Sequence, residues 1–594
     1  MSSSPGQAQD WLDKFLGFTH GSPKVKANTG YLLFRLIYSM VIVHSGVIFA
    51  GIIVFEALEI AHCNTSTDDD GATCGSTDDL ADDNGDCGKL WGLIKPDSLL
   101  TAISSAAGVA TAILCPLAGT AMDFTPYRKD VGFYSIGICF FGTLMCVTLV
   151  EPTEFTLLLC SLGFVLVYIF KEGVTMTCDC YVPELSKDPY EISAATSGGA
   201  IWLFIGEISQ ILFFVIVSYI VPRNLYGTVV TIISCTMMIF FSYFAHERLP
   251  HVVPSRHIPN DLTLLSFSFV RLGQLSGEVV NNFPDLGLLF FANMIFDPAL
   301  QTIFVAAILI MVSKYRFTSS QITIVLFVAI IGAIPGAMAA KWAVHTTLLD
   351  RCYPGAAAAA ALRHSALLPS DSESASDVPP GSPAAVEAEE RAEAARIAEL
   401  DSKEETVVKM KVALIFGLLA TTVVTILANF VMSECQFFLG MVFGFLWGFF
   451  LSWCWNSSNM LRNALVPGGS EAEFSGLNFS SINLFAWLPT LIFTIANEAG
   501  SIDEAILSLN VFFLVGAAVV AQMDIKRGLA AREFTLGLRR WVHEDSSAGD
   551  SNKPCLESAV NLAIEIPNTR GAGAGTGAGI NGEIQEVEMS PVVV

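Results

Sequence analysis

HERLPHVVPSRHIPNDLTLLSFSFVRLGQLSGEVVNNFPD, residues 246–285, is a polar stretch that separates six long apolar runs from six more. A helix that crosses a bilayer needs about 20 mainly apolar residues, and each run is close to that length. Hydrophobic residues make up 53% of the chain and charged residues 15%, whereas about 25% charged residues is usual in a soluble domain. The sequence therefore predicts an all-α membrane protein with twelve transmembrane helices in two six-helix bundles.

The apolar runs also define the expected domain organisation. A cytosolic tail (1–32) precedes the first bundle (33–245), a linker (246–286) leads to the second bundle (287–524), and a cytosolic tail (525–594) follows. The spans are expected near residues 33–60, 98–121, 131–150, 155–178, 194–220, 227–245, 287–311, 320–345, 411–431, 437–455, 476–497 and 504–524.

The basic residues predict which side of the membrane each loop occupies. With both termini in the cytosol, the opposite loops hold five of the 32 Lys and Arg residues, which agrees with the excess of positive charge in cytosolic loops. Of three Asn-x-Ser/Thr sequons, Asn64 then lies on the non-cytosolic side and is the expected glycan acceptor. The same loop, 61–97, carries Cys74 and Cys87, for which a disulfide is plausible although sequence does not fix the pairing.

Three polar segments hold most of the acidic residues behind the net charge of −24. They are the 61–97 loop, the 346–410 loop and the C-terminal tail. The 346–410 loop has too few apolar residues to build a core, so we expect it to be disordered, with a solvated helix near residues 384–400. In the linker, by contrast, a helical stripe predicts a short amphipathic helix on the membrane surface. Its residues are Leu265, Phe269, Leu272 and Val279.

Polar side chains inside the spans are the candidates for function, because charges in a membrane are costly and mark pathways or paired gates. Glu207 lies about twelve residues into an apolar run; it fits a proton carrier and a neutral, hydrogen-bonded Glu equally well. Asp297 precedes Pro298, where we expect the helix to break, so it fits both a cavity residue and a cap of the following half-helix. The proposed substrate and proton pathway consists of Arg35, Lys171, Glu207, Gln210, Asp297 and Gln301.

A loop after the second span carries a recognisable pattern. Gly119, Asp123, Arg128 and Lys129 resemble the signature loop of the major facilitator superfamily, in which Gly, Asp and two basic residues latch helix ends on the cytosolic side. Gly119 allows close helix approach, and Asp123 can accept hydrogen bonds from a neighbouring helix N-terminus. Tyr127 stands where that family has its first basic residue. The resemblance implies a two-bundle facilitator fold.

Three further stretches resemble a narrower group, the autophagy-related vacuolar amino-acid effluxer family of the same superfamily. They are YVPE (181–184), the run 283–302 that contains Asp297, and LVPGGSEAEFSGL (465–477). The family's Arg upstream of the last stretch corresponds to Asn459 here, although Arg462 lies nearby. The resemblance assigns gating and bundle packing to Pro183, Glu184, Pro467 and Glu473; without it, solvated cytosolic Glu residues are the simpler interpretation.

The resemblance implies a secondary transporter that exports amino acids from a vacuole or lysosome to the cytosol after autophagic breakdown, coupled to protons. Two alternatives stay open: a facilitator for sugars or organic anions, and a non-transporting membrane nutrient sensor. The expected partners are membrane lipid, a small solute and protons. Neither a nucleotide-binding Gly-x-x-x-x-Gly-Lys-Ser/Thr loop nor a metal motif occurs, so we expect no enzyme activity, no cofactor, no metal and no nucleic acid.

Overall fold

The computed structural model describes residues 23–43, 90–91, 96–145, 153–186, 188–221, 223–250, 258–259, 262–313, 315, 317, 319–346, 383–433, 436–499 and 502–533. The tails, most of the 61–97 loop, residues 347–382, and with them Asn64, Cys74 and Cys87, lie outside these ranges. The predictions for these residues stay predictions.

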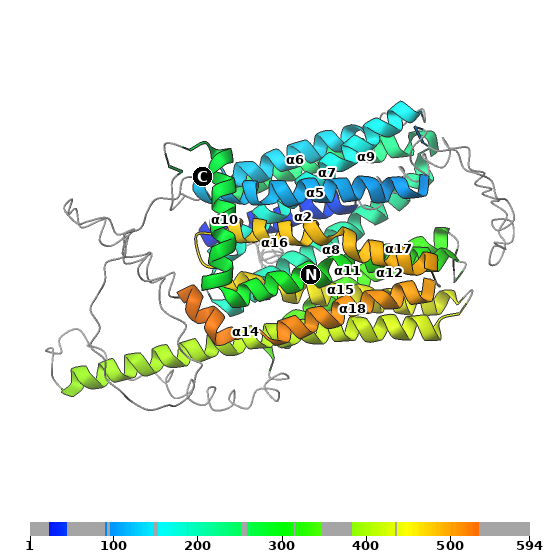
Figure 1. Ribbon diagram of the computed structural model, residues 1–594. Coiled ribbons are helices and arrows are strands. Elements are labelled where there is room, and N and C mark those ends of the chain that lie inside the picture. The colour runs from blue at the N-terminus through cyan, green and yellow to red at the C-terminus, as the bar shows by residue number, and fades with distance from the viewer. Residues whose placement is uncertain are drawn as a thin grey trace, which may run out of the picture. The chain divides into compact units, whose positions relative to one another are not determined.

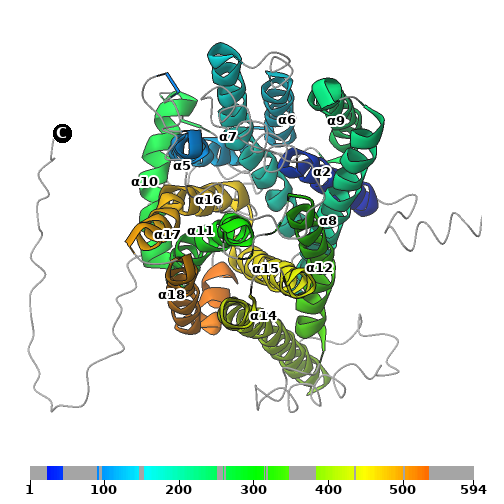
Figure 2. The same cartoon turned by 90° about the vertical axis from the view of Figure 1, so that its right-hand side faces the viewer.

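Helices of the N-terminal half form one group and those of the C-terminal half another (Figure 1, Figure 2). The N-terminal group consists of α2 (Pro23–Val43), α5 (Pro96–Phe124), α6 (Arg128–Leu144), α7 (Glu154–Leu185), α8 (Pro189–Ile220) and α9 (Arg223–Arg248). The C-terminal group consists of α11 (Pro284–Ser313), α12 (Ser319–His345), α14 (Pro383–Val431), α15 (Phe437–Leu465), α16 (Glu471–Phe485), α17 (Trp487–Ala499) and α18 (Ile502–Ala521).

Every predicted span overlaps one of these helices, and the eleventh corresponds to α16 and α17 together. Within the described ranges, ten segments are long and apolar enough to cross a membrane. The other two predicted spans, 33–60 and 131–150, are described only as far as Val43 and Met145. Local signals set the helix starts: Thr153 and Thr156 form a capping box before α7, and Asp188 caps α8 just before Pro189.

The two bundles are joined by the linker helix α10 (Leu264–Asn282), which crosses one end of the helices (Figure 1). We call this end the α10 end. The linker helix was predicted, but its protein-facing side was not. Phe267, Arg271 and Leu275 are buried together with Val279, whereas Leu265 and Phe269 of the predicted stripe are 59% and 51% exposed. Leu265 and Phe269 therefore do not pack against the bundles, and the prediction that this stripe lies on the membrane surface stays a prediction.

Residues 383–410 contain the helix that was predicted near residues 384–400, but its continuity with the next span was not expected. They form the first part of α14, a continuous helix of 49 residues that extends past its neighbours at the α10 end (Figure 1). This segment is rich in Ala and Glu, which favour helix. Propagating a helix outward from a formed span avoids the unfavourable nucleation step, which accounts for the continuity.

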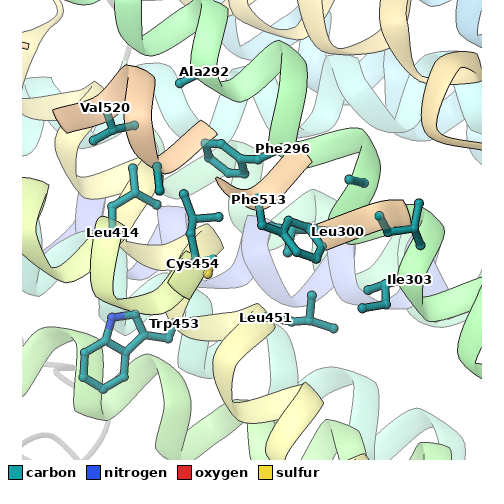
Figure 3. Close-up of a cluster of buried hydrophobic side chains, with 14 of the residues drawn as sticks. Ala292, Phe296, Leu300, Ile303, Leu414, Leu451, Trp453, Cys454, Phe513 and Val520 are labelled. Carbon is teal, nitrogen blue, oxygen red and sulfur yellow. The ribbon is translucent and has the colours of Figure 1, made fainter. Parts of the chain in front are cut away.

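The core of the C-terminal bundle is dominated by aromatic and aliphatic side chains from four helices. Phe296 and Leu300 of α11, Cys454 of α15 and Phe513 of α18 are each completely or almost completely buried (Figure 3). Trp453 packs at its margin and donates a hydrogen bond from its indole N–H to the carbonyl oxygen of Ala413, at 2.8 Å. This packing fixes the positions of α11 and α15, which carry functional candidates.

Candidate functional site

Three buried charges connect the two bundles. Asp179 of α7 accepts hydrogen bonds from Arg35 of α2 through Oδ1 and from Arg462 of α15 through Oδ2. The side chains are 1%, 8% and 2% exposed, respectively. Arg35 also donates from Nε to the hydroxyl of Tyr31, at 3.2 Å. We call Arg35, Asp179 and Arg462 the Asp179 cluster; because buried charges are tolerated only when paired, it holds the bundles together at this level.

A second polar level lies farther from the α10 end. Glu172 precedes Asp179 by seven residues on α7, as Trp455 precedes Arg462 on α15. Seven residues are two helical turns, or about 10 Å. Five spanning helices (α8, α9, α11, α12 and α14) lie between α7 and α15 in the chain, so α7 and α15 run in the same direction. Because Asp179 contacts Arg462, Glu172 and Trp455 therefore lie at similar depth on facing helices.

Charged groups of both signs occupy this second level, which we call the polar level. Trp455 Nε1 donates to Asp297 Oδ1 of α11 at 2.6 Å, and Gln301 also bonds to Asp297. Lys171 Nζ lies 3.8 Å from Glu172 Oε1 and 4.0 Å from the centre of the Tyr168 ring. Glu172 interacts electrostatically with Asp297 across the bundle interface. Lys171, Asp297 and Trp455 are only half-buried, as a solute site requires.

At the α10 end, the predicted signature loop forms a network with the start of α16. Asp123 accepts the backbone N–H of Glu473 at 2.8 Å and the Arg128 guanidinium at 2.6 Å. Arg128 Nη2 also lies 3.6 Å from Glu471 Oε2. A carboxylate at a helix N-terminus is favoured by the helix dipole. Asp123 thus ties α5 of one bundle to α16 of the other.

The linker helix takes part in this network through Arg271. Its Nε donates to Glu473 at 2.8 Å, and its Nη1 donates to Glu278 of the same helix at 2.5 Å. Burial lowers the pKa of Arg271, but the hydrogen bonds to Glu278 and Glu473 outweigh it, so the pKa rises above its ordinary value. Arg271 therefore stays charged and connects the linker helix to Glu473 of α16. We call Asp123, Arg128, Arg271, Glu471 and Glu473 the gate network.

Polar contacts also join α8 to the C-terminal bundle, at Ser193 near the α10 end and at Ser197 at the depth of the polar level. Ser193 Oγ lies 2.6 Å from His345 Nε2 of α12. Asn456 of α15 donates to Ser197 Oγ at 3.0 Å and to the Ala337 carbonyl at 3.1 Å. Together with the gate network, the Ser193 contact closes the bundles against each other at the α10 end.

The remaining pathway candidates lie apart from the Asp179 cluster. Glu207 is 7% exposed on α8, and among the described residues no cation pairs with it. Gln210 donates to Ser234 of α9 at 3.4 Å, within its own bundle. The structure thus brings Arg35, Lys171, Asp297 and Gln301 toward the bundle interface but does not place Glu207 and Gln210 in the same cluster.

The expectation that the helix breaks at Asp297 is wrong. Helix α11 continues from Pro284 to Ser313 through Pro298. Pro298 removes only the N–H that would bond to the carbonyl of Met294, a loss that spanning helices tolerate. The Asp297 carboxylate accepts a hydrogen bond from the indole N–H of Trp455. Because α11 is continuous, there is no second helix start for Asp297 to cap.

The other predicted gate residues lie at the α10 end. Gly119 faces the backbone of Ala472 and Glu473. Lys129, Pro183 and Pro467 are buried, and the side chain of Glu184 lies outside the described part. A turn between α15 and α16 contains Gly469, whose φ of 79° is a conformation that Gly adopts without strain.

Sequence reasoning left out several residues of the site. Asp179, Glu172 and Arg462 are not among the predicted pathway residues. Arg271 was not predicted to have a role, whereas Glu471 lies in the 465–477 stretch, to which the resemblance assigns gating. The available signal was the same for all: an ionisable residue within or beside an apolar run. What was missing was the partner of each charge.

Comparisons with known proteins bear on the fold. No family model and no curated protein matches the chain. Similar solved structures include a bacterial homologue of the iron transporter ferroportin in an outward-facing state, with TM-score 0.52 and 10% identity over 85% of this chain and 99% of that one. The human organic anion transporter MFSD10 has TM-score 0.52 and 12% identity over 84% and 100%. The transporter FucP in the outward conformation has TM-score 0.50 and 10% identity over 83% and 98%.

These likenesses extend over both bundles and confirm the predicted architecture. All three similar proteins are transporters, as the expectation of a non-enzymatic membrane protein requires. At this level of identity the likeness concerns the arrangement of helices, not the solute. The chain has the twelve-helix, two-bundle fold of the major facilitator transporters.

Proposed function

We propose that this protein is a secondary transporter that exports amino acids from a vacuole or lysosome to the cytosol by alternating access. The observation that carries this proposal is the polar level: Lys171 and Glu172 of one bundle lie at a depth similar to that of Asp297 and Trp455 of the other, two helical turns from the Asp179 cluster. Transporters built from two such halves bind solute between them and rock one half against the other.

The charges of the two levels favour a zwitterion. The three cations Arg35, Lys171 and Arg462 balance the three anions Asp179, Glu172 and Asp297. A zwitterion adds no net charge to this buried group, whereas an organic anion adds one. Its carboxylate matches the guanidinium groups, and its ammonium matches Glu172 and Asp297. A sugar has no group that needs so many charges.

The contacts between the bundles support alternating access. Those of the gate network, the Asp179 cluster and Ser193 all lie toward the α10 end. They are polar and therefore exchangeable, so a rocking motion breaks a few hydrogen bonds rather than a large apolar core. The two solved transporters in outward states have a comparable fold.

Glu207 is the proposed carrier of the coupling proton. It is a buried carboxylate in a spanning helix without a cation partner among the described residues. A charge in that position is strongly disfavoured, so the site gains a proton readily and releases it when water enters. The resemblance of residues 465–477 to vacuolar effluxers supports the direction of transport, the link to autophagic recycling and an acidic organelle as the proton source.

The test is uptake of a labelled mixture of the twenty amino acids into proteoliposomes that contain the purified full chain, with and without an imposed proton gradient. We expect gradient-dependent uptake, and addition of a protonophore should abolish accumulation. Binding of amino acids by folded protein without any flux would contradict transport and favour the nutrient-sensor alternative. Flux of sugars or organic anions in place of amino acids would overturn the solute assignment.

A further inference from the structure

Asp179 is shared by two guanidinium groups from opposite bundles. Arg35 lies 144 residues before Asp179 in the same bundle, and Arg462 lies 283 residues after it in the other. The bond to Arg35 is therefore internal to one bundle, whereas the bond to Arg462 has to break when the bundles separate at the α10 end.

Arg462 retains an unused donor. Its Nε is buried without a hydrogen-bond partner among the described residues, although the whole side chain is about 2% exposed. Its guanidinium carbon lies 5.4 Å from the centre of the Phe479 ring. A buried N–H without an acceptor is costly. Arg462 lies two turns from Trp455 on α15 and interacts electrostatically with Asp297. Its side chain therefore borders the polar level on the side nearer the α10 end.

We propose that the carboxylate of the transported solute replaces Asp179 on Arg462, so that solute binding itself releases the bond between the bundles. This inference rests on the proposed transport of amino acids. Asp179 then acts as an internal competitor that occupies the solute's receptor in the empty protein, and Arg462 determines specificity for a carboxylate.

Charge pairing is maintained on both sides of this exchange. In the empty protein, Asp179 pairs with both Arg35 and Arg462. In the loaded protein, Arg35 keeps Asp179 and Arg462 pairs with the solute carboxylate. No buried charge loses its last partner in either state, so the two states can lie close in free energy. One carboxylate replaces another on the same guanidinium, and the spare Nε allows a two-pronged bond to the incoming group.

The same geometry excludes solutes without a carboxylate. An amine or a neutral amide that enters the polar level offers no anion to Arg462. Release of Asp179 would then leave the Arg462 guanidinium buried and unpaired, so the bundles stay joined. A ligand can shift a conformational equilibrium only by binding the two states with different affinity, and here the carboxylate supplies that difference.

The experiment measures binding to the purified full chain in nanodiscs. The probes are alanine, leucine and phenylalanine, the amide of each, and the matching acids without the amine: propionate, 4-methylpentanoate and 3-phenylpropionate. In the wild type we expect the amino acids to bind and the amides to bind at least tenfold more weakly. Asp179→Asn removes the competitor, so it should bind the amino acids at least fivefold more tightly and also gain affinity for the acids.

Two further variants complete the test. Arg35→Gln leaves Arg462 as the sole partner of Asp179, so amino-acid binding should weaken at least fivefold although Arg462 is intact. Asp179→Glu keeps the competing carboxylate and should restore an affinity near that of the wild type. Asp130→Asn is the matched control, because Asp130 pairs with His246 at 2.9 Å within the N-terminal bundle, and its affinity should not change.

The outcomes separate the two proposals. Wild-type binding with no gain in Asp179→Asn and no loss in Arg35→Gln would overturn the exchange and leave the transport proposal standing. If Asp179→Asn does not fold, the loss predicted for Arg35→Gln and the amide ratio of the wild type decide the matter. No binding of any amino acid by folded wild type would overturn the proposed function and the exchange together.

Discussion

A β-carbon on Gly119 of α5 would lie 2.5 Å from the carbonyl oxygen of Ala472 on α16. The two residues belong to different bundles, and backbone atoms cannot move aside as a flexible side chain can. Gly119 is therefore required for the bundles to meet at the α10 end. The glycine of the signature loop has a direct steric reason in this chain.

Gly119→Val should push α5 and α16 apart and disfavour the state that is closed at the α10 end. We expect uptake into proteoliposomes to fall at least tenfold, with the protein still folded, because one state of the cycle becomes strained. Gly137→Val on α6 is the matched control, since a β-carbon there meets nothing within 4 Å. Equal activity of both variants would show that close approach of α5 and α16 is not needed.

Asp297→Asn should change the solute preference of the polar level. Removing this carboxylate takes away one partner of the solute ammonium but leaves the hydrogen bond from Trp455, at 2.6 Å, to the remaining oxygen. We expect weaker binding of phenylalanine and stronger binding of 3-phenylpropionate, about tenfold each, since one charge pair is worth roughly that factor in a partly buried site. Parallel loss of both ligands would indicate a structural role for Asp297.

Glu207→Gln tests the proposed coupling residue. The amide has the size of the protonated acid but cannot release a proton, so exchange of labelled for unlabelled amino acid should continue. Accumulation driven by the proton gradient should fall at least tenfold. Glu247→Gln, at an exposed position near the end of α9, is the control. Gradient-driven uptake that is unaffected in Glu207→Gln would exclude Glu207 as the carrier and direct attention to Glu172 and Asp297.

Asp285→Asn should destabilise the C-terminal bundle. The Asp285 side chain is fully buried; it accepts from Arg527 at 2.6 and 2.8 Å and from the backbone N–H of Asp524 at 2.7 Å. Hydrogen bonds to a charged group contribute about 1.5 to 3 kcal/mol, so the free energy of unfolding should drop by about that amount.

Unfolding of the purified protein in detergent checks this value. Asp130→Asn serves as the comparison, because its pair with His246 is about one-third exposed, and exposed pairs contribute at most about 1 kcal/mol. A smaller loss for Asp285→Asn than for Asp130→Asn would contradict the assigned role of burial.

The sequence by itself determined the number and positions of the spanning helices and the linker helix, because the length of an apolar run that crosses a bilayer is a local property. It also identified Asp123, Arg128 and Gly119 through their spacing in one loop, and Arg35, Lys171 and Asp297 as costly charges inside spans. The sequence did not predict the buried side of α10 or the continuity of α11 through Pro298, because each depends on contacts with other helices.

Only the tertiary structure decided which charges meet. Asp179 lies 283 residues from Arg462 and 144 from Arg35, and hydrophobic periodicity carries no information about pairs so far apart. The energy of a buried charge depends on its partner rather than on its own position in a helix. Folding of the two bundles against each other brings three charges that are far apart in the sequence into one buried cluster.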